Sequence, residues 1–365
     1  MVTGGVDASG RERVVPALLW LVERLARRHE LHVFALHYYP EPRTYPLAGA
    51  TIHDLGRVEG PPGLRRLRLR SRLVRALGSC GPFDLLHAYL GMPGAIATAA
   101  GRRLAVPVVV TLDSGELVAL DDIAYGLQRR WIDRRAIAGA IRNASRVTVS
   151  TAWMAARPAL GRADVDVVPI GVEPALFPLA TRAEGPPWRL LRVGSINRVK
   201  DYPTLLRAFA RLRARSLDAR LEIVGVDTLD GSMQTLCRQL GVADSVTFHG
   251  FQPTDALAPI YARAHVHVVS SRHEAANVAM LEAASCGVPT VGTAVGYAAD
   301  WSADGRAVAV AIGDADALAS AIADLLHDRA RRNRIAAAAR AWTLAHDADF
   351  TAARFQRIYA EVTAK

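Results

Sequence analysis

The chain repeats one pattern that limits its fold more than any other, because short apolar, strand-like runs alternate with helix-like segments along most of its length. The strand-like runs occupy residues 31–36, 84–87, 106–111, 146–150, 189–196, 220–224, 246–248, 265–270 and 290–292. Helix-like spacing of apolar residues covers residues 11–28, 203–213, 233–240 and 278–285. Strands that alternate with helices build parallel sheets with helices on their faces, so the sequence predicts an α/β fold.

The alternation is interrupted between residues 179 and 187, where Glu184-Gly-Pro-Pro187 is typical of a linker. A chain of 365 residues suits two or three domains of about 150 residues each. We therefore predict two doubly wound, Rossmann-like domains that face a central cleft. The first spans residues 1–183 and is joined by a C-terminal helix at about 346–365, and the second spans residues 188–345. Ligands of such sheets bind beyond the carboxyl ends of the strands.

The first glycine loop, Gly4-Gly5, follows only three residues. A doubly wound domain normally opens with a strand that leads into this loop, and three residues are too few for a strand of normal length. Either the start lies late or the sheet lacks its first strand. We expect the first sheet to begin at Leu31.

The composition excludes several classes of protein. It is 51% hydrophobic and 22% charged, as in a globular chain rather than a disordered or fibrous one. The longest apolar run, residues 104–112, is about half of the roughly 20 residues that a membrane-spanning helix needs. The start has no signal-peptide pattern, and the three cysteines suggest no disulfide framework. These features predict a cytoplasmic location.

The net charge of +10 is carried almost entirely by arginine, because only Lys200 and Lys365 are lysines. The densest basic cluster, residues 65–75, interleaves arginine with leucine at helical spacing. Such a segment suits contact with anionic lipid at the inner membrane face, although a solvated helix face is the more common explanation. No nucleic-acid-binding motif accompanies it, so we expect no nucleic-acid partner.

The segment with the most chemical content is residues 270–289, in which a strand leads into a loop, a helix and a Gly-Val-Pro turn. Glu274 lies on the loop and Glu282 lies eight positions later on the helix. The helix begins near Asn277, where free backbone N–H groups favour a phosphate or a sugar oxygen. Lys200 is the one lysine inside the chain and precedes a helix that Pro203 helps to start, so its compact ammonium suits a phosphate.

This segment resembles the Glu-x7-Glu signature of retaining GT-B glycosyltransferases, the group-one family that uses nucleotide sugars. Other family-like motifs follow the family's order along the chain, and the resemblance covers nearly the whole sequence. They are Gly4-Gly5, Asp84-Leu-Leu-His87, Val168-Pro-Ile-Gly-Val-Glu173, Val193-Gly-Ser-Ile-Asn-Arg-Val-Lys-Asp201, Gly250-Phe251 and Thr293-Ala-Val-Gly296. The resemblance implies transfer of a sugar from a nucleotide-diphosphate sugar to a glycan, lipid or small-molecule acceptor, with retention and without a metal or another cofactor.

The resemblance also implies roles for individual residues. Glu274 would contact hydroxyls of the donor sugar, Glu282 would contact the ribose, and Lys200 would contact the diphosphate. Backbone amides near Asn277 and Val278 would help to hold the diphosphate. Further donor-binding positions are expected at Gly5, Ser195, Gly225 and Phe251.

Three positions depart from the family pattern. Ser195 stands where the family usually has an arginine, and Arg198 is the candidate to supply that charge. Asp113 stands where many members have a histidine, so its acceptor-side role is open. Tyr297 replaces a glycine that usually follows Gly296.

The histidines allow two interpretations. His265 and His267 have a period-two spacing that could suit a metal, but the strand around them is apolar and favours packed side chains. His87 lies at a strand end, where a packed role and a role facing the cleft are about equally supported.

Two other functions stay open beside the glycosyltransferase. One is a nucleotide-sugar epimerase of the same fold, and the other is a sugar-nucleotide-binding protein without turnover, which the replacements at Asp113 and Ser195 would allow.

Overall fold

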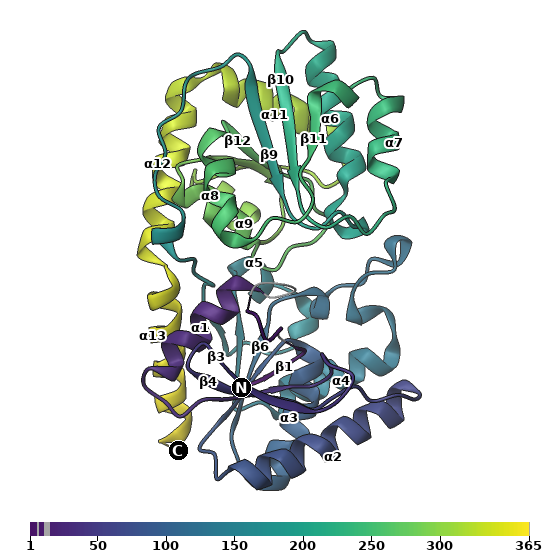
Figure 1. Cartoon of the computed structure of the whole chain (residues 1–365), viewed down its shortest axis with the longest axis vertical. Coiled ribbons are helices and arrows are strands. Elements are labelled where there is room, and N and C mark those ends of the chain that lie inside the picture. Colours follow the sequence, from purple (N-terminus) through teal and green to yellow (C-terminus); the bar gives the residue numbers. More distant parts are fainter. Residues whose placement is uncertain (6, 11–14, 365) are drawn as a thin grey trace. The chain divides into compact units, whose positions relative to one another are not determined.

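The structure, a computed structural model, describes residues 1–5, 7–10 and 15–364 (Figure 1). The chain forms two compact units. Unit 1 comprises Met1–Ile170 with Ala348–Lys365, and unit 2 comprises Gly171–Asp347. Each is an α/β unit built on one sheet, as the alternating pattern predicts. Part of the helix predicted at 11–28 lies outside the described residues, and α1 covers Pro16–Ala26.

Unit 1 contains an eight-stranded sheet in the order β3-β4-β2-β1-β5-β6-β7-β8. All neighbouring strands are parallel except β3, which runs antiparallel to β4. The strands are β1 Val2–Thr3, β2 His32–Ala35, β3 Arg43–Leu47, β4 Ala50–Asp54, β5 Leu86–Tyr89, β6 Val108–Leu112, β7 Arg146–Val149 and β8 Val165–Val167. The helices are α1, α2 Pro62–Cys80, α3 Gly91–Leu104, α4 Trp131–Asn143, α5 Ala152–Ala155 and α13 Ala348–Thr363.

The expectation that the first sheet begins at Leu31 was wrong. β1 precedes Gly4 and lies in the middle of the sheet, where Val2 pairs with Phe34 of β2 and Ala88 of β5. The strand is only two residues long, but it is held on both sides: the Phe34 amide donates to the Met1 carbonyl at 2.8 Å. Val2 is completely buried, so two residues suffice where neighbouring strands supply the packing.

Unit 2 contains a six-stranded parallel sheet in the order β11-β10-β9-β12-β13-β14. This is the order of a classical dinucleotide-binding sheet. The strands are β9 Trp188–Val193, β10 Ala219–Val224, β11 Val246–Phe248, β12 Val266–Val269, β13 Thr290–Thr293 and β14 Val308–Val310. The helices are α6 Tyr202–Ala214, α7 Ser232–Gln239, α8 Thr254–Arg263, α9 Val278–Ser285, α10 Gly296–Ser302, α11 Ala315–His327 and α12 Arg329–Ala345.

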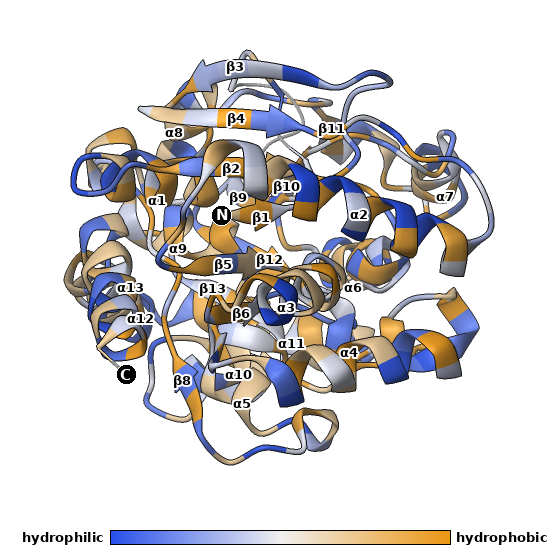
Figure 2. Ribbon diagram, turned by 90° about the horizontal axis from the view of Figure 1, so that it is seen from below, coloured by the Kyte–Doolittle hydropathy of each residue, from blue (hydrophilic) through white to orange (hydrophobic). Residues whose placement is uncertain are grey.

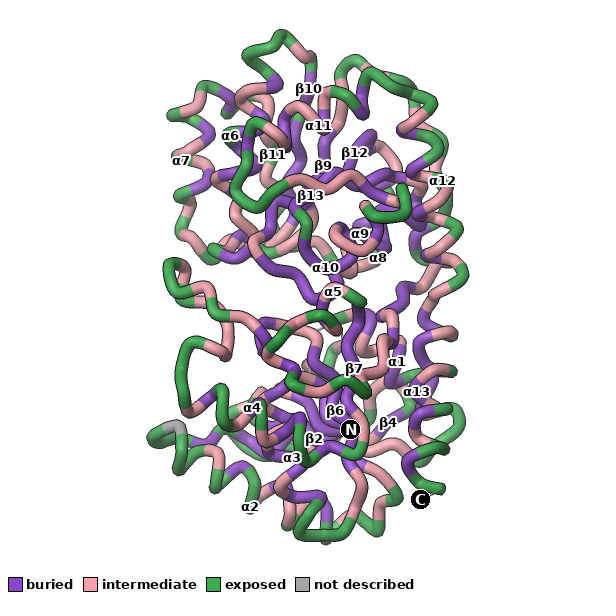
Figure 3. The backbone as a smooth tube through the Cα atoms, turned by 180° about the vertical axis from the view of Figure 1, so that it is seen from behind, coloured by how far each residue is buried: buried purple, intermediate pink, exposed green. Residues whose placement is uncertain are grey.

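The core of unit 2 forms where α6 and α11 cover the sheet. Leu205, Phe209, Leu221, Leu318 and Ile322 are completely buried there. The inner strands β10, β12 and β13 are buried along most of their length, the edge strands β11 and β14 are only partly buried, and the helices have exposed outer faces (Figure 3). On α2 of unit 1, hydrophilic and hydrophobic residues alternate along the helix (Figure 2). No helix within the described ranges is long and apolar enough to cross a membrane.

The division between the units lies earlier than the interruption in the sequence pattern. Residues 171–183 pack in unit 2, although the sequence places them in the first domain. Phe177 is completely buried, and its carbonyl accepts a hydrogen bond from Ser285 Oγ at 2.7 Å. Arg182 donates to the carbonyls of Cys286 and Gly287 at 2.7 and 2.9 Å. These contacts attach the segment before the Gly-Pro-Pro sequence to α9 and the turn after it.

The C-terminal helix α13 belongs to unit 1 and packs against α1. Arg24 Nε of α1 donates to Asp349 Oδ1 at 2.7 Å. The Tyr359 hydroxyl and Nδ1 of the buried His87 form a hydrogen bond of 2.6 Å. The other ring nitrogen of His87 lies 2.7 Å from Thr111 Oγ1, and burial lowers the pKa of this histidine to about 3. His87 therefore has a packed, neutral role.

His265 and His267 are also packed side chains, as the apolar strand predicts. His265 Nδ1 accepts from the Arg189 amide at 2.9 Å. His267 Nδ1 lies 3.2 Å from Thr290 Oγ1, and burial lowers its pKa to about 3.

Candidate functional site

The sheet of unit 2 changes its direction of winding between β9 and β12, which are neighbouring strands. Loops that leave such a pair of strands diverge at their carboxyl ends and form a binding crevice. Residues 194–201 connect β9 to α6, and residues 270–277 connect β12 to α9. The two loops carry Lys200 and Glu274, so the fold brings the two most informative sequence positions to one edge.

The carboxylate of Glu274 is the centre of this edge. Glu274 is buried, and Lys200 Nζ lies 2.8 and 2.7 Å from its two oxygens. Ser271 Oγ donates to the same carboxylate at 2.6 Å. Burial by itself raises the pKa of Glu274, but Lys200 and a second cation outweigh it and hold the pKa below its ordinary value. The carboxylate is therefore ionised at neutral pH.

The second cation is Arg192, which the sequence did not single out. It lies within β9, is completely buried, and places Nη2 3.6 Å from Glu274 and 2.8 Å from Ser271 Oγ. Its Nε and Nη1 atoms have no hydrogen-bond partner among the described residues. A signal was present in Leu190-Leu191-Arg192: a central parallel strand is buried on both faces, so an arginine within it needs a buried anion.

The helix that follows the Glu274 loop begins beside the carboxylate. Asn277 precedes α9 with φ of 80°, a left-handed conformation that asparagine tolerates better than most residues. Its side chain donates weakly to Glu274 at 3.4 Å, and Val278 is the first helical residue. A β-carbon at Gly296 would lie 3.0 Å from the Glu274 carbonyl, so this glycine lets the turn before α10 approach the loop.

Glu282 has a different environment from Glu274. It is buried on α9, and its Oε2 accepts a hydrogen bond from the buried Tyr261 hydroxyl at 2.7 Å. No cation forms an ion pair with Glu282 among the described residues, and burial raises its pKa to about 7. Two carboxylates on one motif thus differ in charge near neutral pH.

Three further predicted donor-binding positions, Ser195, Gly225 and Phe251, lie on the carboxyl-side loops of the same sheet, whereas Gly5 lies in unit 1. The Gly225 amide donates to the Gly250 carbonyl at 2.8 Å, so the loops after β10 and β11 are adjacent. Gly225 has φ of 149°, and a β-carbon there would lie 2.2 Å from the Gly194 carbonyl oxygen, which explains the glycine. Phe251 is half exposed, and Ser195 is exposed.

Comparison with known proteins agrees with this architecture. The model for "Glycosyl transferases group 1" matches residues 180–342, and the model for a "Glycosyl transferase 4-like domain" matches residues 14–171. A D-inositol 3-phosphate glycosyltransferase from Stackebrandtia nassauensis is 30% identical over 95% of this chain and 85% of its own. The chain belongs to the group 1 glycosyltransferases. The family resemblance noted in the sequence is confirmed.

Solved structures confirm the GT-B fold of this glycosyltransferase. Sucrose-phosphate synthase from Thermosynechococcus elongatus superposes with a TM-score of 0.81 and is 23% identical, covering 94% of this chain and 92% of its own. HepE from Anabaena, in complex with UDP and glucose, has a TM-score of 0.75 and is 16% identical, covering 99% of each chain. A GDP-mannose-dependent alpha-(1-6)-phosphatidylinositol monomannoside mannosyltransferase from Mycolicibacterium smegmatis matches over a shorter segment and is 35% identical over 40% of each chain.

Two arginines could supply the positive charge that is missing because Ser195 stands where the family usually has an arginine. They are Arg198 and Arg192, and their environments differ. Arg198 is exposed in a short 3-10 turn, Arg198–Lys200, and its side chain has no ion pair among the described residues. Arg192 instead approaches Glu274 from within the sheet. The glycosyltransferase therefore has one exposed and one buried guanidinium near the motif that ends in Lys200.

Asp113 and Gly5, the remaining predicted positions, lie in unit 1. Asp113 follows β6 and accepts hydrogen bonds from the hydroxyls of Tyr89 and Ser150, the former at 3.1 Å. Gly5 follows β1, and a β-carbon there would lie 2.6 Å from Tyr38 Cβ. Both positions are at the carboxyl edge of the first sheet, and their roles stay predictions.

Among the described residues, the side chains that lie close enough to share a metal ion are His32, His53 and Cys80 of unit 1. His32 Nδ1 and His53 Nε2 are 2.9 Å apart and form a hydrogen bond, and the rings stack. Cys80 Sγ lies 3.9 Å from His53 Nε2. His32 begins β2, so the cluster is at the opposite edge of the sheet from Gly5 and Asp113.

Replacement of Arg192 tests its role in unit 2. Arg192→Met should lower the free energy of unfolding by about 3–5 kcal/mol, because the variant leaves a buried carboxylate with one cation fewer. The double variant, Arg192→Met with Glu274→Gln, should lose less free energy of unfolding than the two single variants lose together, with a coupling of about 1–3 kcal/mol. Urea unfolding at pH 7 gives the free energy of unfolding of the wild type, the two single variants and the double variant. Arg220→Met, at an exposed position on β10, is the control.

The loss in Arg192→Met should also depend on pH in a defined direction. Glu274 has a lowered pKa when folded, so its stabilising contribution is present above its unfolded pKa and disappears as the pH falls through the folded value. In Arg192→Met the contribution should disappear at a higher pH.

If the losses of free energy of unfolding in Arg192→Met and Glu274→Gln simply add in the double variant, Arg192 and Glu274 do not interact.

Proposed function

We propose that this glycosyltransferase takes its sugar from a nucleoside-diphosphate sugar bound at the carboxyl edge of the unit 2 sheet and transfers it with retention. The observation that carries the proposal is the Lys200–Glu274 pair beside the start of α9. Support also comes from structural neighbours of the same fold, since one is described in complex with UDP-glucose and another as bound with UDP-2-fluoro glucose.

In this mechanism Lys200 exchanges partners. Its side chain is 23% exposed, whereas Glu274 and Arg192 are almost inaccessible, so an incoming diphosphate can draw the ammonium away. Arg192 then remains beside Glu274 and keeps the carboxylate ionised. The freed carboxylate accepts hydrogen bonds from hydroxyls of the donor sugar, which orients the anomeric carbon.

The transfer step needs little from a protein base. The bond between the anomeric carbon and the diphosphate oxygen breaks, and the acceptor oxygen bonds to the same face of that carbon. The acceptor proton moves to the departing diphosphate. Lys200, helped by the amides of Asn277 and Val278 and by Arg198, stabilises the negative charge that develops on the leaving group.

The acceptor belongs to the class of glycans, lipids or small molecules. Relatives that act on D-inositol 3-phosphate or on a phosphatidylinositol monomannoside favour an acceptor that carries phosphate. Asp113, held by Tyr89 and Ser150, is the candidate polar contact on the acceptor side.

Family membership favours transfer over the two alternatives that the sequence left open. An epimerase incubated with donor alone would produce an isomerised nucleotide sugar. A binding protein without turnover would release no nucleoside diphosphate. A glycosyltransferase should instead hydrolyse its donor slowly and transfer the sugar when an acceptor is present.

Lys200→Ala should lower kcat/KM for donor hydrolysis by roughly 10²–10³, as expected for loss of one preorganised electrostatic group. The assay is release of nucleoside diphosphate from a panel of UDP- and GDP-sugars. Arg207→Ala, an exposed cation on α6, is the control and should retain activity. Near-wild-type turnover of folded Lys200→Ala at saturating donor would contradict the proposed role.

Donor binding should also depend on the ionisation of Glu282. The pKa of this residue is raised to about 7 by burial, and ribose hydroxyls that donate to the carboxylate favour its ionised form. Affinity for UDP or GDP, measured by calorimetry, should therefore rise about tenfold between pH 6 and pH 8 if only the ionised form binds.

Glu282→Gln separates this effect from titration of the diphosphate itself. The variant should bind more weakly at pH 8 and lose the part of the pH dependence that belongs to Glu282. An identical pH profile in the two proteins would remove Glu282 from the ribose site.

We further propose that α2 contacts anionic membranes. Leu64 and Leu67 are 43% and 51% exposed, and Arg68, Arg70 and Arg75 are exposed on the same helix. Arg66 does not belong to this surface, because it forms an ion pair with Asp133. The cytoplasmic location and the lack of a nucleic-acid partner stay predictions.

Replacement of Arg68, Arg70 and Arg75 by glutamine should weaken partition onto vesicles that contain phosphatidylglycerol. Each arginine contributes about 1 kcal/mol near an anionic surface, and added salt should reduce the wild-type partition. Arg207, Arg238 and Arg334, exposed on unit 2 helices, give a control with the same change of charge. Equal partition of both triple variants would show that α2 has no specific contact.

A further inference from the structure

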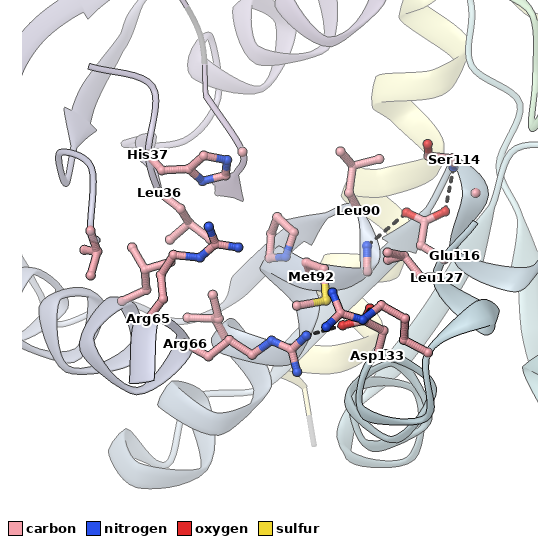
Figure 4. Close-up of a pocket in the computed structure, with 18 of the residues that line it drawn as sticks. Leu36, His37, Arg65, Arg66, Leu90, Met92, Ser114, Glu116, Leu127 and Asp133 are labelled. Atoms are coloured by element: carbon pink, nitrogen blue, oxygen red, sulfur yellow. Dashed lines mark hydrogen bonds and ion pairs between the residues drawn. The ribbon is translucent and has the colours of Figure 1, made fainter. Parts of the chain in front are cut away.

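Unit 1 contains a pocket of about 960 Å³ at the carboxyl edge of its own sheet (Figure 4). Its lining includes residues at the carboxyl ends of four strands: Gly4, Leu36 and Leu90 directly follow β1, β2 and β5, and Ser114 lies two residues after β6. The pocket therefore spans β2, β1, β5 and β6 at the place where a doubly wound sheet binds ligands. Its volume is that of a small-molecule site.

One part of the pocket is apolar. Leu36, Leu69 and Ile96 are buried at its base, and Met92 and Leu127 are partly exposed within it. Glu116 also lines the pocket, but its two oxygens accept hydrogen bonds from the amides of Gly91 and Ser114 at 3.0 and 2.7 Å. This carboxylate therefore fixes the loop after β6 rather than presenting charge to a ligand.

Another part of the lining, beside Leu36, is basic. Arg57 and Arg65 line the pocket beside His37, and neither arginine side chain has a hydrogen-bond or ion-pair partner among the described residues. Figure 4 shows His37 and Arg65 on the same side of the pocket. Burial lowers the pKa of His37, and the positive charge of Arg65 and Arg57 lowers it further, so the imidazole is neutral at pH 7 and can donate one hydrogen bond.

The remaining arginines of the lining differ from these two. Arg66 pairs with the buried Asp133, as the dashed line in Figure 4 shows, and Arg129 Nε lies 3.0 Å from Asp121. Arg130 lies 4.0 Å from Asp133. The uncompensated positive charge is therefore concentrated at Arg57 and Arg65, from the loop after β4 and the first turns of α2.

We propose that this pocket binds the acceptor through a phosphate ester, with the phosphate on Arg57, Arg65 and His37 and a partly apolar remainder over Leu36, Met92 and Leu127. The identification of this ligand as the sugar acceptor rests on the proposed function, whereas binding of a phosphate ester in the pocket does not. Two guanidinium groups match phosphate oxygens in geometry and charge, and the neutral imidazole adds a donor. Such a ligand is either a membrane lipid or a soluble phosphorylated molecule.

Binding without donor separates these sources. The probes are dihexanoyl phosphatidic acid as a soluble lipid phosphate, glycerol 3-phosphate as the soluble ester, and dihexanoylglycerol as the lipid without phosphate. We expect both phosphates to bind in calorimetry and dihexanoylglycerol to bind much more weakly. Tighter binding of phosphatidic acid than of glycerol 3-phosphate indicates a lipid acceptor, and the reverse order indicates a soluble one.

The paired variant Arg57→Gln with Arg65→Gln should weaken phosphatidic acid binding roughly 10²-fold, since two charge-assisted contacts are lost. Arg103→Gln with Arg142→Gln removes the same charge from exposed positions of unit 1 outside both the pocket lining and α2, and should change binding little. Met92→Ser should weaken phosphatidic acid but not glycerol 3-phosphate.

Binding of UDP or GDP to unit 2 provides the internal control. All variants should retain it together with the wild-type thermal unfolding profile, which shows that both units are folded and keeps this test independent of the proposed donor site. Equal phosphate affinity in the Arg57/Arg65 variant and the Arg103/Arg142 variant would overturn the phosphate-ester proposal. Absence of nucleotide binding in the wild-type protein would instead contradict the donor site and leave the pocket result intact.

Discussion

A buried carboxylate governs the arrangement of unit 2. An ionised glutamate away from water is strongly unfavourable unless cations and hydrogen bonds compensate it. Glu274 receives Lys200 on both oxygens, Arg192 at 3.6 Å and Ser271 as a hydrogen-bond donor. These residues come from β9, the loop after it and the loop after β12, so the parallel order of the sheet is what allows the charges to meet.

The two cations have different access to a ligand. Arg192 is enclosed in the sheet and stays with the carboxylate, whereas Lys200 is partly exposed and can contact an incoming anion. A single cation could not both leave Glu274 and keep it ionised. Glu282 lacks such a partner and stays close to its protonation midpoint, with a pKa of about 7. The site therefore has one carboxylate of fixed charge and one that titrates near neutrality.

The sequence predicted features that repeat along the chain better than features that occur once. β11 and α9 begin and end at the predicted residues, because apolar runs and turn residues mark both ends. β1 was missed because two residues have no period, and Val2 becomes a strand only through its neighbours. Arg192 was missed because its role depends on Glu274, 82 positions later in the chain. The pocket of unit 1 gathers residues from many loops, and no local motif marks it.

A crystal structure of the protein with UDP or GDP would show directly whether Lys200 exchanges Glu274 for the diphosphate. We expect Lys200 Nζ to leave Glu274 and to lie within hydrogen-bond distance of a phosphate oxygen. Arg192 should still face Glu274, and the ribose hydroxyls should donate hydrogen bonds to the Glu282 carboxylate. A nucleotide bound elsewhere, or a Lys200–Glu274 pair that persists beside an ordered diphosphate, would contradict this exchange of partners.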